Sequence, residues 1–177
     1  MQNGENSYRR YLEGDEGAFT EVLELYFNNL TLFINGYLND VHASEDVAID
    51  TMLELVVHKK RYAFRSSLKT YLFAIARHKA LNHLKKHRRT VLTPPDELEL
   101  ADRTSLETEV IENERKRRLH RAIASLESDL QTAVHLVYIE GMSYKEAASV
   151  MKKSPKQVDN LITRAKARLK AELSDME

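Results

Sequence analysis

The 177-residue sequence predicts an all-α protein built from two small helical domains with an acidic linker between them. Glycine and proline are scarce, with five and three residues, and β-branched residues do not alternate with polar ones over any useful length. Apolar residues recur instead every three or four positions, as they do on the buried face of a helix. A third observation, the arrangement of charge, divides the chain into segments.

The formal net charge is zero, with 27 basic and 27 acidic residues. These charges are nevertheless segregated along the chain. Residues 1–54 carry −9, residues 55–95 carry +11, residues 96–114 carry −7, and residues 115–177 carry +5. Blocks of this kind indicate separate contact surfaces for separate partners.

The acidic first block contains several amphipathic stretches. Asp15 can cap a first helix, and a further apolar set follows past Asn28-Asn29 and stops at Asn39-Asp40. Ser44 can cap a second helix from residue 45 to about 58. The second helix has one apolar side and one acidic side, with Leu53 and Val57 among the acids. The acidic side is therefore either an ordinary solvated face or a protein-docking face, and the helix alone does not decide between them. Its apolar side holds Ala48, Met52, Leu55 and Val56, and its acids are Asp46, Asp50 and Glu54.

The segment of residues 55–95 holds eleven Lys or Arg, four His and no acidic residue. Ser66 or Ser67 can cap a helix that runs to about Arg89 and becomes more basic toward its end. Lys and Arg gain from displacing the counterions condensed on phosphates, so this segment suits a polyanion. A solvated helix face is the plain alternative, but the missing acids and the interleaved aromatic residues Tyr71 and Phe73 favour a nucleic acid. The positions expected to face the core are Leu68, Tyr71, Leu72, Ile75 and Ala76.

Pro94-Pro95 ends the basic segment, and the acidic residues that follow have few apolar groups to bury. We therefore predict domains at residues 1–92 and 115–177, joined by an acidic linker over residues 93–114 with some helix from about Leu106.

The last block has the sequence signs of a helix-turn-helix. After helices at about residues 115–126 and from a Ser128 cap to Gly141, Ser143 and Glu146 form the pattern of a capping box for a helix through Met151. Ser154 and Gln157 repeat the pattern for a final helix to about residue 173. In such a motif the second helix enters the major groove of DNA. The outward residues on its first half are Lys156, Gln157, Asn160, Thr163 and Arg164, and Lys152, Lys153, Lys166 and Arg168 sit where phosphates would run.

The sequence contains no pattern of a catalytic or metal-binding site. Without cysteine, disulfides and thiolate chemistry are excluded. His83 and His87 have i, i+4 spacing, but no carboxylate or thiol stands near them to complete a metal site. We therefore expect no enzyme, no metal and no cofactor. The N-terminus has no signal-peptide core and no apolar run approaches about 20 residues, which predicts a cytoplasmic protein.

Three longer motifs occur in a characteristic order and spacing: ASEDVAIDTMLELV (43–56), SLKTYLFAIARHKALNHLKKHRR (67–89) and EGMSYKEAASVMKKSPKQVDNLITRAKARL (140–169). Together they resemble the bacterial RNA polymerase sigma factors of the extracytoplasmic-function (ECF) type, over roughly residues 16–89 and 115–172. The resemblance implies a protein that binds core RNA polymerase and promoter DNA, with an anti-sigma factor as a further partner and no membrane insertion.

The resemblance also implies a role for each block. The first would dock on the polymerase clamp, the loop of residues 61–67 with the basic helix would melt the −10 element, the linker would thread the polymerase cleft, and the C-terminal domain would read the −35 element as duplex. The implied polymerase-binding residues are Asp46, Asp50, Leu53 and Glu54. The implied −10 contacts are Arg61, Arg65, Tyr71, Arg77, His78, Lys79, Asn82, Lys85 and Lys86. The implied −35 contacts are Lys152, Lys153, Ser154, Lys156, Gln157, Asn160, Thr163 and Arg164.

Several positions depart from the family pattern. Tyr71 stands where Trp is usual, and His78 stands where Asn is frequent. Lys152 occupies a turn position usually held by Gly, so a positive φ there would cost on the order of 1 kcal/mol.

Two other functions compete with this interpretation. A stand-alone helix-turn-helix repressor or activator would bind duplex DNA tightly without polymerase, normally as a dimer on palindromic sites. An adaptor that binds only proteins is disfavoured by the eleven uncompensated bases of residues 55–95.

Overall fold

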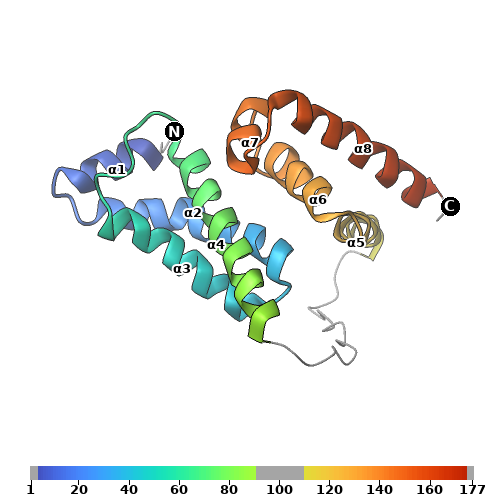
Figure 1. The fold of residues 1–177 in the computed structure, drawn as a ribbon, viewed down its shortest axis with the longest axis horizontal. Helices are drawn as coiled ribbons and strands as arrows, with labels where there is room; N and C mark the ends of the chain where they lie inside the picture. The colour runs from blue at the N-terminus through green and yellow to red at the C-terminus, as the bar shows by residue number, and fades with distance from the viewer. Residues whose placement is uncertain (1–3, 91–109, 175–177) are drawn as a thin grey trace.

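The computed structural model describes residues 4–90 and 110–174, and every regular element in these ranges is a helix. The all-α fold class is confirmed. The N-terminal domain holds α1 (Gly4–Leu12), α2 (Ala18–Leu38), α3 (Val41–Val57) and α4 (Leu68–Thr90) (Figure 1). The C-terminal domain holds α5 (Val110–Ala124), α6 (Ser128–Val134), the π-helix η1 (His135–Ile139), α7 (Tyr144–Met151) and α8 (Pro155–Ser174).

Helix α2 is the centre of the N-terminal domain, because α1, α3 and α4 all pack against it. Leu30 and Ile34 of α2 are fully buried, as are Leu55 of α3 and Leu72 of α4. Burying one such side chain stabilises the fold by roughly 1.5–3 kcal/mol, so the helical spacing of these residues fixes which side of each helix turns inward.

The starts of α3 and α4 are set by side chains that accept hydrogen bonds from the first backbone amides. Ser67 caps α4 as predicted, its Oγ accepting from the amide of Thr70 at 3.1 Å. At α3 the cap is Asp40, whose Oδ1 accepts from the amide of Ala43 at 3.0 Å. The prediction of a Ser44 cap is therefore wrong, because an equally good cap residue stands four positions earlier. Ser44 is buried in the first turn and donates to the Asp40 carbonyl at 2.6 Å.

The helix-turn-helix consists of α7 and α8, and both predicted caps are present. The Ser143 amide donates to Glu146 Oε2 at 2.9 Å, and the Glu146 amide donates to Ser143 Oγ at 3.2 Å. Ser154 and Gln157 repeat these two bonds at 2.7 and 3.2 Å. Between the helices, Lys152 has φ 53°, the left-handed conformation in which a non-glycine residue is strained.

The helices before the helix-turn-helix differ from the prediction. Helix α5 begins at Val110, which agrees with the helix expected from about Leu106 within the linker; residues 93–109 of the predicted linker lie outside the described ranges. Ser128 does not cap α6, because Glu127 occupies the N-cap position without a side-chain hydrogen bond. The π-helix η1 was not predicted, whereas Gly141 does end this stretch, with φ 67°.

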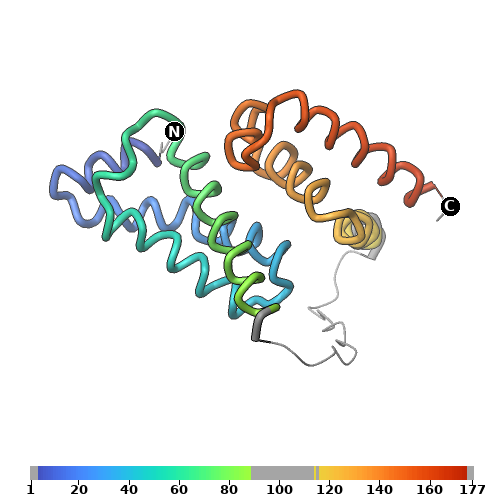
Figure 2. Tube along the Cα trace, in the orientation of Figure 1, coloured from blue at the N-terminus to red at the C-terminus, as the bar shows by residue number. Residues whose placement is uncertain are grey.

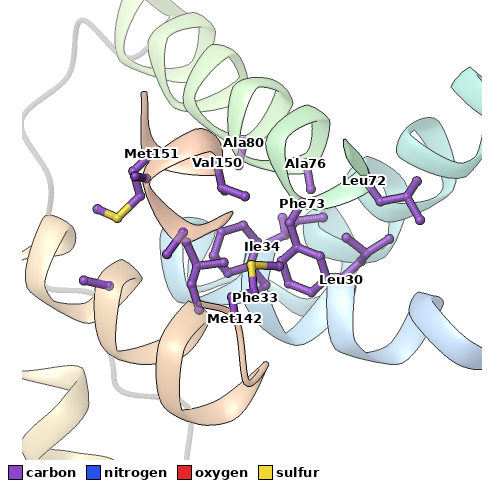
Figure 3. Packing of buried hydrophobic residues seen from close by; sticks show 14 of the residues in the cluster. Leu30, Phe33, Ile34, Leu72, Phe73, Ala76, Ala80, Met142, Val150 and Met151 are labelled. Atoms are coloured by element: carbon purple, nitrogen blue, oxygen red, sulfur yellow. The ribbon is translucent and has the colours of Figure 1, made fainter. Parts of the chain in front are cut away.

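The two domains share one apolar cluster. Helix α7 packs against α4, with the two domains side by side in Figures 1 and 2. Figure 3 shows Met142 and Val150 of the C-terminal domain facing Phe33 of α2 and Phe73 and Ala80 of α4. All five of these residues are at most 4% exposed. The helix-turn-helix is thus packed on the N-terminal domain in this structure.

None of the described helices combines the length and the apolar character that crossing a bilayer requires.

Candidate nucleic-acid and protein-binding surfaces

One side of α3 carries three exposed apolar side chains framed by acids. Ile49 and Leu53 are each 47% exposed and Val57 is 67% exposed, with Asp46 and Asp50 exposed beside them. We call these five residues the α3 face. Sequence reasoning missed Ile49, although residues 49, 53 and 57 recur at i, i+4 and i+8. An apolar centre with a charged rim is the arrangement of a protein-docking patch.

Glu54, predicted to bind polymerase, differs from the acids of the α3 face because its carboxylate is engaged in ion pairs. Its carboxylate is half-buried and meets Lys79 of α4 at 3.4 Å, Arg61 of the following loop at 3.3 Å and His58 at 3.8 Å. The structure therefore brings Glu54 together with two of the predicted −10 contacts. The carboxylate joins α3, α4 and the loop between them.

The loop between α3 and α4 packs on a cluster of aromatic side chains that the sequence analysis did not predict. Tyr62 is buried; its hydroxyl donates to the Ser66 carbonyl at 2.7 Å, and its ring centroid lies 5.9 Å from that of Tyr8 in α1. The Tyr8 hydroxyl donates to the Leu55 carbonyl at 2.8 Å. Burial, aided by the neighbouring tyrosines, raises the pKa of Tyr8 to about 12.

Phe64, within this loop, has φ 55°, which is costly for a bulky side chain. Its ring lies 4.6 Å from the Tyr62 ring and under the guanidinium of Arg9, 4.3 Å away. A strained backbone conformation of this kind persists only where neighbouring contacts hold it in place, and such conformations are typical of functional loops. The consequence here is a fixed loop with Arg61 and Arg65 exposed on it.

The solvent side of α4 carries most of the predicted −10 contacts. His78 and Asn82 are exposed and neighbouring, with Asn82 Nδ2 3.3 Å from His78 Nε2, and Lys85 and Lys86 are exposed further along the helix. Tyr71 is half-buried, its ring centroid 5.0 Å from that of Tyr62.

Phe73, expected to be an aromatic contact for nucleic acid, is fully buried. Its ring packs 5.0 Å from that of Phe33, so that expectation is wrong. The α4 surface therefore offers one aromatic ring, Tyr71, and not two.

Arg77 is partly buried beside Tyr37 of α2 and is not fully exposed on the solvent side of α4. Its Nε is buried and has no hydrogen-bond partner within the described residues. The guanidinium lies beside the hydroxyl of Tyr37, which is 2.5 Å from Thr132 Oγ1 of α6. Burial raises the pKa of Tyr37, although the hydrogen bonds with Thr132 and Arg77 act in the opposite direction.

Helix α8 presents its polar side to solvent, as predicted. Val158, Leu161, Ile162 and Ala165 are buried against α6 and α7. Opposite them, the polar side chains expected at the −35 element are exposed, except for Lys153, which is partly covered. These side chains belong to Lys152, Ser154, Lys156, Gln157, Asn160, Thr163 and Arg164.

Several of these side chains already have partners within the C-terminal domain. Lys153 meets Asp129 at 3.0 Å, Lys156 meets Asp159 at 3.8 Å, and Arg164 meets Glu127 at 3.4 Å. Gln157 Oε1 is engaged in the helix cap. Asn160, by contrast, has no side-chain partner among the described residues, so both its amide oxygen and its amide nitrogen are available.

The described residues contain no group of three or more His, Cys, Asp or Glu side chains that could hold a metal ion. His83 and His87, the pair considered above, have their rings stacked with centroids 6.1 Å apart.

Two family models match the chain. The model described as sigma-70 region 2 matches residues 24–90, and the model described as sigma-70, region 4 matches residues 116–169. Curated relatives extend over most of the chain. The ECF RNA polymerase sigma factor SigM of Bacillus subtilis is 26% identical over 85% of this chain and 92% of its own length. The RNA polymerase sigma-H factor of Pseudomonas aeruginosa is 28% identical over 89% of this chain and 86% of its own.

The chain belongs to the ECF sigma factors. It is thus a sigma factor that directs promoter-specific transcription by RNA polymerase. A stand-alone repressor or activator is not favoured, because a helix-turn-helix of that kind would account for the region 4 match but not for the region 2 match.

Solved structures show that this sigma factor shares its fold with others. The sigma factor RpoE, in complex with the anti-sigma factor NepR from Bartonella quintana, has a TM-score of 0.67 at 23% identity, covering 88% of this chain and 96% of that one. CnrH, in complex with the cytosolic domain of CnrY, has a TM-score of 0.69 at 21% identity, covering 97% of both.

Within this sigma factor, the region 2 match contains the α3 face, Glu54 and the whole solvent side of α4. The region 4 match contains the helix-turn-helix.

Proposed function

We propose that this sigma factor divides its work among three surfaces. The α3 face docks on core RNA polymerase, α4 with the loop before it opens the −10 element, and α8 reads the −35 element. The best support for this division is that three different helices carry the three kinds of surface. Helix α3 has an exposed apolar patch, α4 has cations beside an aromatic ring, and α8 has exposed polar side chains suited to a DNA groove. We place the domain boundaries at residues 92 and 115, so that the two DNA elements are handled by different domains. On this proposal the chain acts in the bacterial cytoplasm as a polymerase subunit, without enzymatic activity of its own.

Docking through the α3 face is supported by its exposed apolar centre. Ile49, Leu53 and Val57 lose hydration when a partner covers them, at roughly 25 cal/mol per Å² of apolar area. Asp46 and Asp50 at the rim would attract a basic partner surface and speed its association. We assign Glu54 a different part: held by Lys79 and Arg61, it positions the −10 loop against α4 and does not contribute a free charge to docking.

Opening of the −10 element is supported by the combination of cations and one ring on α4. An unpaired base can stack on an aromatic side chain, which contributes about 1–3 kcal/mol per base. Tyr71 is the ring available for this, and its contact with Tyr62 holds it in place. We propose that the extruded base lies beside His78 and Asn82, while Arg65 and Lys85 contact the phosphates on either side.

Reading of the −35 element is supported by the exposed start of α8. An Asn side chain with both amide groups available can bind adenine through its N6 and N7 atoms. Asn160 is such a side chain, whereas Gln157 has its oxygen committed to the cap. We therefore propose that Asn160 reads an adenine and that Gln157 supplies a single donor. Lys152 and Lys153 would contact phosphates, which position the helix without reading sequence.

We also propose an anti-sigma factor as a partner of this sigma factor. The support is the solved RpoE structure, which holds an anti-sigma factor on a chain of the same fold.

The test is transcription reconstituted from purified components. The protein is added to core RNA polymerase with a library of genomic fragments, and run-off transcripts are sequenced. The proposal expects specific transcripts only when both proteins are present, with weak DNA binding by the sigma factor alone. Tight binding to duplex DNA without polymerase, together with no transcripts, would refute it.

A further inference from the structure

Helix α1 lies outside the region 2 match, which begins at residue 24, and none of the three proposed surfaces includes it. It nevertheless contacts the loop of residues 58–67 that precedes α4, and Figure 1 shows the two side by side. The contacts come from Glu5, Tyr8 and Arg9. These residues share one side of α1, because Tyr8 and Arg9 stand three and four positions after Glu5.

The two ends of the loop are fixed by hydrogen bonds to α1. At the start, the buried Tyr8 donates from its hydroxyl to the carbonyl of Leu55, in the last turn of α3, at 2.8 Å. At the end, Glu5 Oε1 accepts from the amide of Leu68, the first residue of α4, at 3.2 Å. That amide has no acceptor within its own helix, and the carboxylate also meets the positive end of the helix dipole. Helix α1 therefore ties together the two helices that the loop joins.

Between these ends, α1 holds the loop through Phe64. The guanidinium carbon of Arg9 lies 4.3 Å from the centroid of the Phe64 ring, and the centroid of the Tyr8 ring lies 6.4 Å from it. Because Phe64 has φ 55°, its backbone conformation needs contacts of this kind to persist. Arg65 follows directly and is exposed. The conformation at Phe64 therefore decides where the chain presents Arg65.

The composition of the loop explains why it needs support from outside. Residues 58–67 include four exposed cations and no acidic residue. These cations are Lys59, Lys60, Arg61 and Arg65. Like charges this close together repel, which favours loop conformations that spread them apart. Helix α1 opposes this at a second point, since Lys59 Nζ lies 4.4 Å from the centroid of the Tyr11 ring.

The other side of α1 is anchored to α2. Ser7 Oγ donates to Glu21 Oε2 at 2.6 Å, and Arg10 Nη1 lies 3.0 Å from Glu21 Oε1. Both bonds favour the charged carboxylate, so they lower the pKa of Glu21. Because α2 is the centre of the N-terminal domain, α1 is a fixed support for the loop.

We propose that Arg9 is a positioning residue for promoter opening. Stacked on Phe64, it holds the loop so that the exposed side chains of Arg61 and Arg65 face the opened −10 strand. Arg9 acts through Phe64 and does not itself bind DNA. The inference rests on the proposed assignment of this loop to the −10 element.

The first experiment measures promoter opening for a double-mutant cycle of Arg9→Ala and Phe64→Leu. The polymerase-bound protein is mixed with a promoter found by run-off transcription that carries a fluorescent base in its −10 element. Leucine keeps an apolar side chain at residue 64 but has no ring on which a cation can stack. We expect Arg9→Ala to slow opening at least fivefold in the native chain and less than twofold in the Phe64→Leu background. Equal factors in the two backgrounds would overturn the proposal, because a direct contact of Arg9 with DNA does not need the Phe64 ring.

The matched control is Arg10→Ala. It removes the same side chain from the next position of the same helix, where the guanidinium is exposed and pairs with Glu21. Exposed ion pairs contribute little to stability, so we expect opening within twofold of the native rate and unchanged competition for core polymerase. Arg9→Ala should also compete as the native protein does. An equal loss of opening in the two variants would refute a specific role for Arg9, and weaker competition by Arg9→Ala would count against a role in opening.

The second experiment tests the hold on the loop without polymerase or DNA. Trypsin cleaves after Lys and Arg, so the loop offers four sites, and cleavage in a folded chain requires local opening. The first cuts in the full chain are located by mass spectrometry. We expect cleavage within residues 58–67 to be at least threefold faster in Arg9→Ala than in the native protein or in Arg10→Ala. Equal rates in all three proteins would overturn the hold.

Together the two experiments separate failure of this inference from failure of the proposed function. If the native protein opens no promoter with core polymerase, the proposed function fails and the role of Arg9 in opening fails with it. If the native protein opens promoters and Arg9→Ala opens them equally fast, the positioning role is refuted while the proposed function stands.

Discussion

Replacement of Lys152 by glycine should stabilise this sigma factor and weaken its hold on the −35 element at the same time. Lys152 ends α7 with φ 53°, a conformation that costs a residue with a Cβ about 1–2 kcal/mol. Glycine removes this strain but gives the unfolded chain more freedom, which offsets about 0.4–1 kcal/mol. The amide of residue 152 keeps its bonds to the carbonyls of Ala148 and Ser149. The net gain is about 0.5–1 kcal/mol, or up to about 2–4 °C in Tm for a chain of this size.

The matched control is Lys152→Ala, which removes the same charge but keeps the strained backbone. Thermal unfolding of both variants measures the backbone effect, and salt titration of binding to −35 duplex DNA by the polymerase-bound protein measures the charge. Both variants should lower the slope of log K against log salt by about 0.9, which corresponds to one lost phosphate contact. Only Lys152→Gly should gain stability. Equal stability of the glycine and alanine variants would refute the strain assigned to residue 152.

Two further predictions concern the other surfaces. Changing Asp46 and Asp50 to Lys should weaken competition for core polymerase at least several-fold without changing thermal stability, because both side chains are exposed. Changing Asn82 to Ala should slow open-complex formation, followed with a fluorescent base in the −10 element, while leaving polymerase binding unchanged.

Each of these has its own control. For docking, Glu13→Lys and Glu16→Lys change exposed acids away from the α3 face and should leave competition unaltered; equal loss in this pair would point to net charge and not to the face. For melting, lost polymerase binding in the Asn82 variant would contradict the assignment.

Local signals could be read correctly from the chain because their partners lie within three residues. The capping boxes Ser143–Glu146 and Ser154–Gln157 formed as predicted, since each needs only its own helix start. The Ser44 and Ser128 predictions failed where another residue took the cap position. In the first case Asp40, four residues earlier, was an equally good acceptor.

The sequence by itself determined the helical class, the two domains, the family motifs and the side of each helix that carries polar groups, because these follow from the 3.6-residue period and from charge along the chain. Only the tertiary structure decided that Phe73 is core, that Arg77 Nε is buried, and that Glu140 meets Lys69 across 71 positions of sequence. The physical reason is that the burial of each side chain depends on a segment distant in the sequence that packs against it. The spacing of residues along one helix does not indicate which segment that is.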